Sequence, residues 1–496
     1  MARSWQSPNR WLGWASLLFV LLASSGCEED VIYRDRVLFD DPPAAAGDFL
    51  GFSDVDANET VCGNCHVGKQ AEWILTAHAD AWETLEESGE SRAFCEGCHT
   101  VNERGNATEG SVGWDATKDE RYQDVQCESC HGPGLQHVQN PDASQPLASI
   151  RADTLATNGC GECHSGAHHP FVEEWSESGH ARLNATPAGR EACQSCHTAQ
   201  GALRAFGERS EYIEKDSAQL PLTCAVCHDP HGGANTAEGQ HAGQLRFPVR
   251  NAPSIDEHLC AQCHNRRDAP VSTSHGLEPH APQAGLLEGT AGWWAPGSVF
   301  NPIRGTHGSD RNPGLCATCH VVSFSAEDQL TGGEIFTTGH MFNAIPCTDA
   351  SGAPTTDDCA YTVSARSWQG CTASGCHGDA TAARSALISQ ASSVLELADS
   401  LHTLLLIVDP TGEAPGGEID DTNPTFTVAE GAIFNFHLAK FNGEGVDPLH
   451  SVAATTVHNP FLIETLLRAS INAVQESYGL APPAPAPTGT AQQTRR

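Results

Sequence analysis

The sequence is poor in methionine, tyrosine and positive charge. Two methionines and five tyrosines occur in 496 residues, and 27 lysines and arginines stand against 62 aspartates and glutamates. The formal net charge of −35 argues against nucleic acid as a partner, because phosphates would be repelled. A positively charged protein face or a metal-bearing surface suits this charge better. Acidity that only keeps the chain solvated is the alternative.

Long apolar runs are scarce as well. The clearest one, from Trp11 to Ala23, follows Arg3 and Arg10 and ends in small residues. It has the flanks of an export signal and is too short for a spanning helix. We therefore expect residues 1–27 to be a signal peptide. We expect no membrane-spanning segment further along, because the later run Leu404–Val408 is far too short.

The signal ends in Gly26-Cys27, which resembles a bacterial lipobox, in which the cysteine becomes the lipidated first residue. The lipobox pattern prefers leucine where Ser24 stands, so cleavage near Ala23, leaving Cys27 as a stray thiol, is the alternative. Both routes export the chain. We expect a periplasmic or outer-membrane-anchored location in a Gram-negative type bacterium, with membrane contact through the lipid.

Cysteine and histidine, in contrast, are abundant, with 21 and 25 residues. Sixteen cysteines form Cys-x-x-Cys pairs, and a histidine follows every pair. In such a motif the thiols add across the vinyl groups of a haem and the histidine binds the iron from one side. A zinc or disulfide interpretation leaves the uniform histidine unexplained. The motifs are Cys62/Cys65/His66, Cys95/Cys98/His99, Cys127/Cys130/His131, Cys160/Cys163/His164, Cys193/Cys196/His197, Cys224/Cys227/His228, Cys260/Cys263/His264 and Cys316/Cys319/His320.

A ninth motif has a wider gap. Four residues separate Cys371 from Cys376, and His377 follows. We interpret it as a variant haem site, with a disulfide involving either cysteine as the alternative. Cys347 and Cys359 remain and suit a disulfide in an oxidising compartment. The sequence thus predicts nine covalently bound c-type haems, eight in regular motifs.

The motifs divide the chain into regions. An acidic, proline-containing tether covers residues 28–60, and an octahaem cytochrome domain covers 61–345. The predicted disulfide and ninth haem occupy 346–380, a helical region 381–480 and a disordered tail 481–496. Glycine and proline are frequent, at 47 and 29 residues. We therefore expect a mainly α fold with extensive loops, in which the haems form the core and a helical segment closes the chain.

Two helices are predicted near the end of the chain. The first has an apolar seam, and the second begins at Asn459 as cap with Pro460 in its first turn, a favoured pair. The seam of the first consists of Ile388, Ala391, Leu395, Ala398, Leu401 and Leu405, and the face of the second consists of Leu462, Leu466, Ala469 and Ala473.

A weak internal repeat precedes them. Trp73 is followed five residues later by His78, and Trp175 is followed five residues later by His180. In the first copy the apolar positions share one helical face, so a histidine packed in a core is the ordinary interpretation of His78. Among so many haems we favour iron ligation. The face consists of Trp73, Ile74, Ala77, His78, Ala81, Trp82 and Leu85.

The number of histidines bears on function. Nine serve as proximal ligands, and 16 remain for nine distal positions. After the signal only Met341 could compete as a methionine ligand. We therefore expect mostly bis-histidine irons at low potential, because axial methionine raises the potential. Such irons have no open position and carry electrons.

At these motifs the chain resembles the multihaem cytochromes related to hydroxylamine oxidoreductase and octahaem tetrathionate reductase. The resemblance rests on residues 125–134 around the third motif, Cys227-His228-Asp229-Pro230-His231-Gly232, His280-Ala281-Pro282-Gln283 and Val457-His458-Asn459-Pro460. It implies that His137, His231, His280 and His458 are distal ligands. By position alone we add His78, His180, His307 and His340, while His168 and His169 compete for one site.

Two features of the catalytic branches are missing. The chain has no Cys-x-x-Cys-Lys motif, and its tyrosines offer no candidate for the cross-link of hydroxylamine oxidoreductase. We therefore favour an electron carrier in anaerobic respiration or extracellular electron transfer. Its partners would be redox proteins, other multihaem cytochromes or an external acceptor. A reductase of a small nitrogen or sulfur oxyanion at one open haem is the alternative, and a subunit of a haem wire is a third.

The haem count is directly testable. The intact mass of the holoprotein should correspond to nine haems. Cys371→Ala should disturb haem attachment at the variant motif and so change the measured haem content. If the mass corresponds to eight haems and the substitution leaves the haem content unchanged, the prediction of a ninth haem is wrong.

Overall fold

The computed structural model describes residues 40–152, 159–166, 169–210, 218–232, 243–270, 277–373, 375–441 and 447–480. Cys27 and His168 lie outside these residues. The chain divides into Met1–Asp40, of which only Asp40 is described, and Asp41–Arg496, which contains every element below.

Helices in the motif-bearing part are short, because glycine, proline and turns interrupt the chain every few residues. The α-helices here are α2 (Val67–Trp73), α3 (Ala81–Glu87), α4 (Gly113–Thr117), α5 (Cys127–His131), α6 (Leu135–Gln139), α7 (Phe171–Glu177), α8 (Ala185–Ala188), α9 (Glu191–His197), α10 (Ala199–Ala205), α12 (Cys224–Cys227), α13 (Gln283–Glu288), α14 (Leu315–His320) and α15 (Gln369–Thr372). Single 3-10 turns lie between them: η1 (Ala44–Ala46), η2 (Cys62–Asn64), η3 (Ala77–Asp80), η4 (Glu96–Cys98), η5 (Glu120–Tyr122), η6 (Cys160–Glu162), η7 (Gly179–Ala181), η8 (Ile255–Glu257), η9 (Leu259–Gln262) and η10 (Thr306–Gly308).

Strands are few within the described residues. They form three antiparallel two-stranded sheets. The longest pair is in register from Phe324 opposite Thr337 to Glu327 opposite Glu334. The pairs are β1 (Phe52–Asp54) with β2 (Glu59–Thr60), β3 (Phe324–Glu327) with β4 (Glu334–Thr337), and β5 (Cys347–Thr348) with β6 (Pro354–Thr355). The mainly α fold with extensive loops is therefore confirmed.

The internal repeat is a structural one. The indole Nε1 of Trp73 donates to the Val125 carbonyl at 3.0 Å, and the Val125 N–H donates to the His78 carbonyl at 3.0 Å. Both bonds anchor the histidine to the segment that leads into the third motif. The second copy has the same two bonds before the sixth motif, from Trp175 to the Leu222 carbonyl at 2.8 Å and from the Leu222 N–H to the His180 carbonyl at 3.1 Å.

The single helical face predicted around His78 is wrong. Helix α2 ends at Trp73, Thr76 is extended, and η3 and α3 follow as separate pieces. Ile74 is 41% exposed. His78 therefore lies in η3 and not on α2, and its carbonyl accepts from the Val125 N–H.

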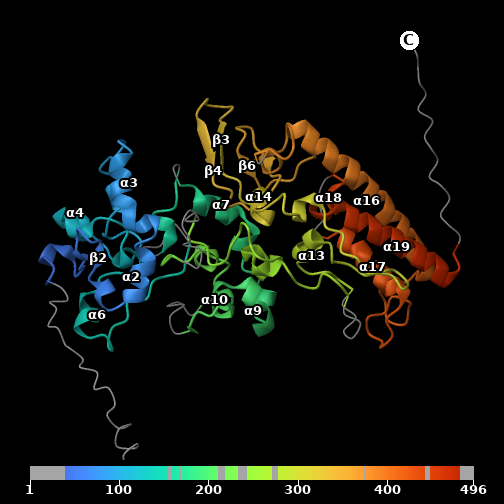
Figure 1. Ribbon diagram of the computed structural model, residues 1–496, viewed down its shortest axis with the longest axis horizontal. Helices are drawn as coiled ribbons and strands as arrows, with labels where there is room; N and C mark the ends of the chain where they lie inside the picture. Colours follow the sequence, from blue (N-terminus) through green and yellow to red (C-terminus); the bar gives the residue numbers. More distant parts are fainter. Residues whose placement is uncertain are drawn as a thin grey trace, which may run out of the picture. The chain divides into compact units, whose positions relative to one another are not determined.

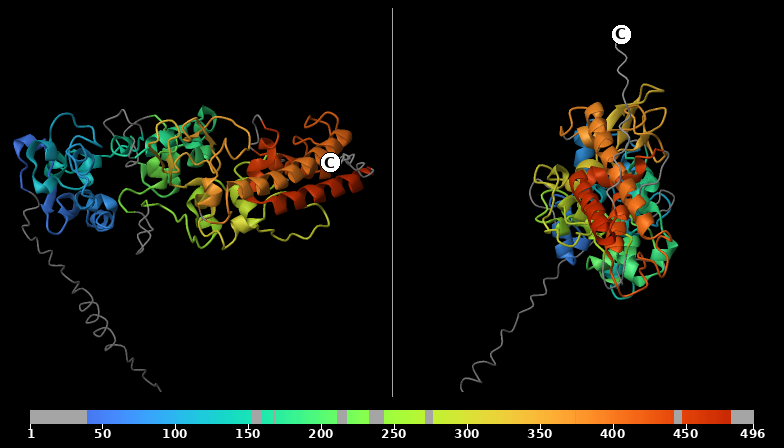
Figure 2. Two further views of the ribbon diagram at one scale, coloured as in Figure 1. Left: turned by 90° about the horizontal axis from the view of Figure 1, so that it is seen from above. Right: turned by 90° about the vertical axis from the view of Figure 1, so that its right-hand side faces the viewer.

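Four helices close the chain: α16 (Ala380–Val408), α17 (Val428–Ala439), α18 (His450–His458) and α19 (Pro460–Tyr478). Helices α16 and α19 lie side by side, and α17 and α18 pack against both (Figure 1, Figure 2). Together they form the largest apolar cluster of the described residues, whereas the motif-bearing part has only small ones. This contrast agrees with haems taking the place of an apolar core among the motifs.

The two predicted end helices are confirmed. At the start of α19 the Asn459 side chain accepts from the Leu462 N–H at 3.1 Å, and Pro460 occupies the first turn. On the predicted faces Ala391, Ala398, Leu401, Leu405, Leu462 and Leu466 are buried, while Ile388, Leu395, Ala469 and Ala473 lie at the less buried edge.

Helix α16 bears on the expectation that no later segment crosses a membrane, which stays a prediction. Among the described residues it alone is long and apolar enough to cross a membrane by length and composition. Core helices of globular proteins share this length and composition. One face of α16 lies in the apolar cluster, through residues such as Leu387, Val394 and Leu401.

A buried carboxylate ties the start of the described chain to the third motif. Glu128, inside that motif, accepts from the N–H groups of Leu50 at 2.9 Å, Gly51 at 2.7 Å and Gly134 at 2.7 Å. Burial raises its pKa to about 7. The three bonds fix the segment before β1 against the loop that follows the motif.

Glu128→Ala should therefore lower stability markedly. Three buried backbone donors would lose their acceptor, at about 1–3 kcal/mol for each that finds no other partner. Thermal unfolding of the holoprotein measures the effect, with the exposed Glu87→Ala as control. A Glu128→Ala protein as stable as that control would contradict the assignment.

Candidate haem-ligand site

Histidine rings face one another in pairs throughout the motif-bearing part. In eight pairs the ring centres lie 5.9–6.2 Å apart. One member of every pair follows a cysteine pair, and the other does not. The pairs are His66–His137, His164–His78, His131–His231, His264–His180, His197–His280, His228–His340, His377–His307 and His320–His458.

This spacing fits one metal ion between two imidazoles. With about 2.0 Å for each metal–nitrogen bond and roughly 1.1 Å from nitrogen to ring centre, opposed rings on one ion stand roughly 6.2 Å apart. Direct ring stacking would bring the centres closer. The donor set therefore fits a six-coordinate haem iron held by two histidines.

Hydrogen bonds at the other ring nitrogen orient these imidazoles. A carbonyl accepts only, so a ring whose Nδ1 faces one carries its proton there and offers Nε2 to a metal. The aspartate of the Asp229–His231 pair, at 3.2 Å, acts in the same way. Carbonyls face Nδ1 of His99 (Ala81, 2.7 Å), His131 (Pro146, 2.5 Å), His137 (Ser144, 2.6 Å), His228 (Gly243), His307 (Val457, 2.7 Å), His320 (Phe342, 2.9 Å) and His458 (Ala454, 2.6 Å).

Burial keeps several of the rings neutral. It lowers the pKa of His164, His180, His340 and His458 to about 4. A neutral imidazole is the form that binds a metal, since a protonated ring has no free lone pair. These four rings are therefore ready to bind iron at neutral pH.

The ninth motif turns like the regular ones despite its longer gap. In the first, fourth, sixth and seventh motifs the histidine N–H donates to the carbonyl of the first cysteine, at 2.9 Å between His66 and Cys62. The His377 N–H donates to the Cys371 carbonyl at 3.3 Å, and the His377 ring faces His307. Cys347 and Cys359 form a disulfide with Cα atoms 6.0 Å apart, where the sequence predicts one.

Two motif cysteines depart from the expectation that the haems form a covered core. Cys65 in the first motif and Cys376 in the ninth are exposed, whereas the other sixteen motif cysteines are half-buried. At Cys65 the reason is local: the residue lies at the end of η2, and the start of α2 that follows it is exposed as well, with Val67 at 66%. Thioether formation by Cys65 and Cys376 stays a prediction, and the haem edges beside them would face solvent.

The remaining described histidines have other neighbours. His169 lies edge-on to His164 at 6.5 Å and stacks on Phe171, so it faces a motif histidine that His78 already faces. Of the other histidines, none faces a motif histidine within the described residues. His258 contacts the Val249 carbonyl and the Cys260 N–H, His402 stacks on Phe436, His437 contacts Glu413 and His450 contacts Arg366.

Thiols of different motifs lie close enough to shift one another's pKa, so these motifs are neighbours in space. The third and fourth motifs approach through Cys130 and Cys160, the sixth and seventh through Cys227 and Cys260, and the eighth and ninth through Cys319 and Cys371. A neighbouring thiol is the first cause of the pKa shift in five further pairs: Cys62 with Cys127, Cys98 with Cys163, Cys160 with Cys224, Cys196 with Cys263, and Cys260 with Cys316.

Comparison with known proteins agrees with this chemistry. The family described as cytochrome c554 and c-prime matches residues 61–132, which hold the first three motifs. The multiheme cytochrome MtrA of Shewanella baltica is 28% identical over 227 residues, 42% of this chain and 59% of that protein. The C-type polyheme cytochrome OmcB of Geobacter sulfurreducens is 26% identical over 184 residues, 34% of this chain and 24% of that protein.

The fold also has a solved relative. The outer cell wall cytochrome OcwA superposes with a TM-score of 0.52 at 16% identity, covering 86% of this chain and all of that one. The matched part is less than two thirds of MtrA and OmcB, so only the class of protein follows from them. The chain is a multihaem c-type cytochrome that carries covalently bound haem c.

Proposed function

We propose that this cytochrome passes electrons along a row of bis-histidine haems. The observation that carries the proposal is the set of eight histidine pairs, each with one member from a cysteine motif. An iron closed by two imidazoles takes up and releases an electron without exchanging a ligand. The cysteines and histidines of the nine motifs would attach the haems, and the second histidine of each pair would be the distal ligand.

The thiol contacts support an order for the haems. Haem edges lie beside the cysteines that bind them, and electron transfer slows steeply with distance. The neighbouring thiols therefore favour a main row through the first, third, fourth, sixth, seventh, eighth and ninth motifs. The second motif contacts the fourth, and the fifth contacts the seventh, so both would lie beside this row.

The two exposed cysteines indicate where electrons would enter and leave the protein. Cys65 belongs to the first motif and Cys376 to the ninth, which are the two ends of the main row. A redox partner could approach the haem edge beside either thiol without displacing the chain. The half-buried cysteines of the motifs in between favour transfer within the protein.

The protein's own part is to fix ligands and exclude water. Backbone carbonyls at Nδ1 hold the rings in one orientation, so little reorganisation accompanies each change of charge. When bound, the haem supplies the redox couple. Burial of rings such as His458 and His164 lowers the local dielectric, which together with two histidine ligands favours a low potential.

Location, partners and superfamily belong to the same proposal. We infer export by the leader and anchoring by lipid on Cys27, in the periplasm or at the outer membrane. Redox proteins, other multihaem cytochromes or an external acceptor would exchange electrons with the row. The motifs around His131, His228 and His458 favour the hydroxylamine oxidoreductase-like and octahaem tetrathionate reductase-like superfamily. A reductase at one open haem is the second candidate, favoured by the single motif histidine that faces no other histidine among the described residues.

His458→Ala tests the ligand assignment. His458 ends α18, and its ring stands 6.2 Å from that of His320 with the planes 12° apart. Its removal should open one iron: one low-spin signal should disappear, a high-spin one should appear, and the reduced protein should bind one more carbon monoxide. The exposed His402→Ala is the control. An unchanged low-spin spectrum with full haem content would sink the assignment.

Cys27→Ser tests the anchor. If a lipid on Cys27 holds the protein, the variant should move from the detergent phase to the aqueous phase with its haem content intact. A variant that partitions into detergent as strongly as the unmodified sequence would show that something other than Cys27 binds the membrane.

A further inference from the structure

A network of hydrogen bonds holds His340, whose ring faces the sixth-motif histidine His228. Three of the bonds converge on one carboxylate: Glu174 accepts from the Thr338 N–H at 2.7 Å, from the Thr338 hydroxyl at 2.7 Å and from the His340 N–H at 2.8 Å. The Thr338 hydroxyl also lies 3.0 Å from Nδ1 of His340. Thr338 is 5% exposed and Glu174 is half-buried, so water competes little for these bonds.

The proton positions in this network follow from the chemistry of its groups. A carboxylate only accepts, so the Thr338 hydroxyl donates its one proton to Glu174. The hydroxyl oxygen then accepts from His340, whose Nδ1 carries the ring proton. The result is a carboxylate–hydroxyl–imidazole relay that leaves Nε2 of His340 free for a metal. The ring centres of His340 and His228 lie 6.2 Å apart, with the planes 22° apart.

Helix α7 contacts His340 through two residues one turn apart. Glu174 lies in the first turn of the helix, and Phe171, three residues earlier, meets the His340 ring edge-on at 5.0 Å between ring centres. Phe171 also meets the fourth-motif histidine His164 edge-on, at 5.7 Å. The segment that follows the fourth motif therefore positions the histidine that faces the sixth.

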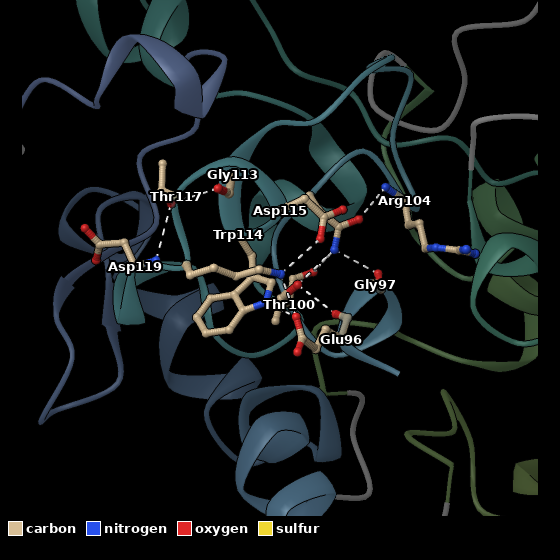
Figure 3. A network of polar contacts seen from close by, with 11 residues as sticks. Glu96, Gly97, Thr100, Arg104, Gly113, Trp114, Asp115, Thr117 and Asp119 are labelled. Carbon is tan, nitrogen blue, oxygen red and sulfur yellow. Dashed lines mark hydrogen bonds and ion pairs between the residues drawn. The ribbon is translucent and has the colours of Figure 1, made fainter. Parts of the chain in front are cut away.

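A carboxylate close to a haem motif does not form such a relay by itself. Glu96, inside the second motif, accepts from Trp114 Nε1 at 2.8 Å and from Lys118 Nζ at 2.6 Å (Figure 3). The hydrogen bond from Lys118, followed by that from Trp114, lowers the pKa of Glu96. Its charge is therefore balanced by a lysine, and neither bond leads to a histidine ring. Glu174 bonds to Thr338 and His340 instead, so its negative charge acts on a haem ligand.

We propose that Glu174, acting through Thr338, is a positioning residue that lowers the reduction potential of the haem held by His228 and His340. The inference rests on the bis-histidine ligation proposed above and deepens it. A hydrogen bond that leads to an anion makes an axial imidazole more basic, and a more basic ligand stabilises ferric over ferrous iron. A backbone carbonyl is neutral and has a weaker effect of this kind. The relay thus makes the sixth haem a low-potential member of the main row.

Thr338→Val is the test, because it removes the hydroxyl and leaves the two backbone bonds to Glu174 in place. In a redox titration of the holoprotein, followed through its low-spin ferric signals, the midpoint potential of one haem should rise. Thr338→Ser keeps the hydroxyl and should keep the original midpoint. His340→Ala identifies the signal of this haem, because the iron should then become high-spin. Glu174→Gln should raise the same midpoint as Thr338→Val.

Glu177→Gln is the matched control. It removes the same charge from the same helix, but Glu177 is exposed and accepts from the Thr356 hydroxyl at 3.2 Å. Its midpoint potentials should all equal those of the unaltered protein. A rise in Glu177→Gln as large as that in Glu174→Gln would show a general effect of charge and overturn the relay.

Other results separate the two proposals. If Thr338→Val keeps the original midpoint, the backbone bond between the His340 ring and Thr338 is sufficient, and the relay is overturned. If Thr338→Val makes the iron high-spin, the hydroxyl only places the ring, which overturns the effect on potential. A rise in Thr338→Val that Glu174→Gln does not share overturns the part of Glu174. If His340→Ala keeps every low-spin signal with full haem content, the histidine ligation at the sixth motif is wrong instead.

Discussion

The structure depends on imidazoles from separate segments that face one another in pairs, in the arrangement that would hold a haem iron between them. Each such site joins two segments that are distant in sequence, as His320 and His458 illustrate across more than a hundred residues. The motif-bearing part has only small apolar clusters, so burial of side chains alone contributes little there. The haem with its two histidines would supply both the apolar mass and the crosslink. Folding of this part and haem attachment are therefore expected to be inseparable.

The C-terminal helices follow a different principle. Helices α16 to α19 form an ordinary apolar cluster, and α18 delivers His458 from its last turn while Asn459 caps α19. A rigid helical unit thus places His458 opposite the motif histidine His320, where it would be the distal ligand of the eighth motif. The same cap residue donates through its amide to the carbonyls of Leu286 and Ile303, which binds this unit to α13. Two consecutive residues therefore have different roles: His458 faces the motif histidine, and Asn459 joins the helices to α13.

Much of this could be predicted from the sequence, because the informative patterns are local. The nine motifs, the cap at Asn459 and the Cys347–Cys359 pair each lie within a few or a dozen residues. The pairing of histidines could not, since it joins separate modules: His78 faces the fourth motif and His180 the seventh. The break at Thr76 was equally hidden, because the position of His78 depends on the bond from the distant Val125 N–H. The exposure of Cys65 was hidden too, because the regular motif carries no sign of which cysteine stays uncovered. The spacing Trp73–His78 and Trp175–His180 was the signal that marked both copies of the repeat.

Iron positions in the holoprotein test the central claim most directly. Anomalous diffraction at the iron edge, from crystals with their haems, would locate each metal ion relative to the rings. We predict eight irons midway between the paired histidines, from His66–His137 to His320–His458, and a ninth bound by His99. Irons that lie away from these midpoints, or histidine pairs that hold no iron between them, would contradict it.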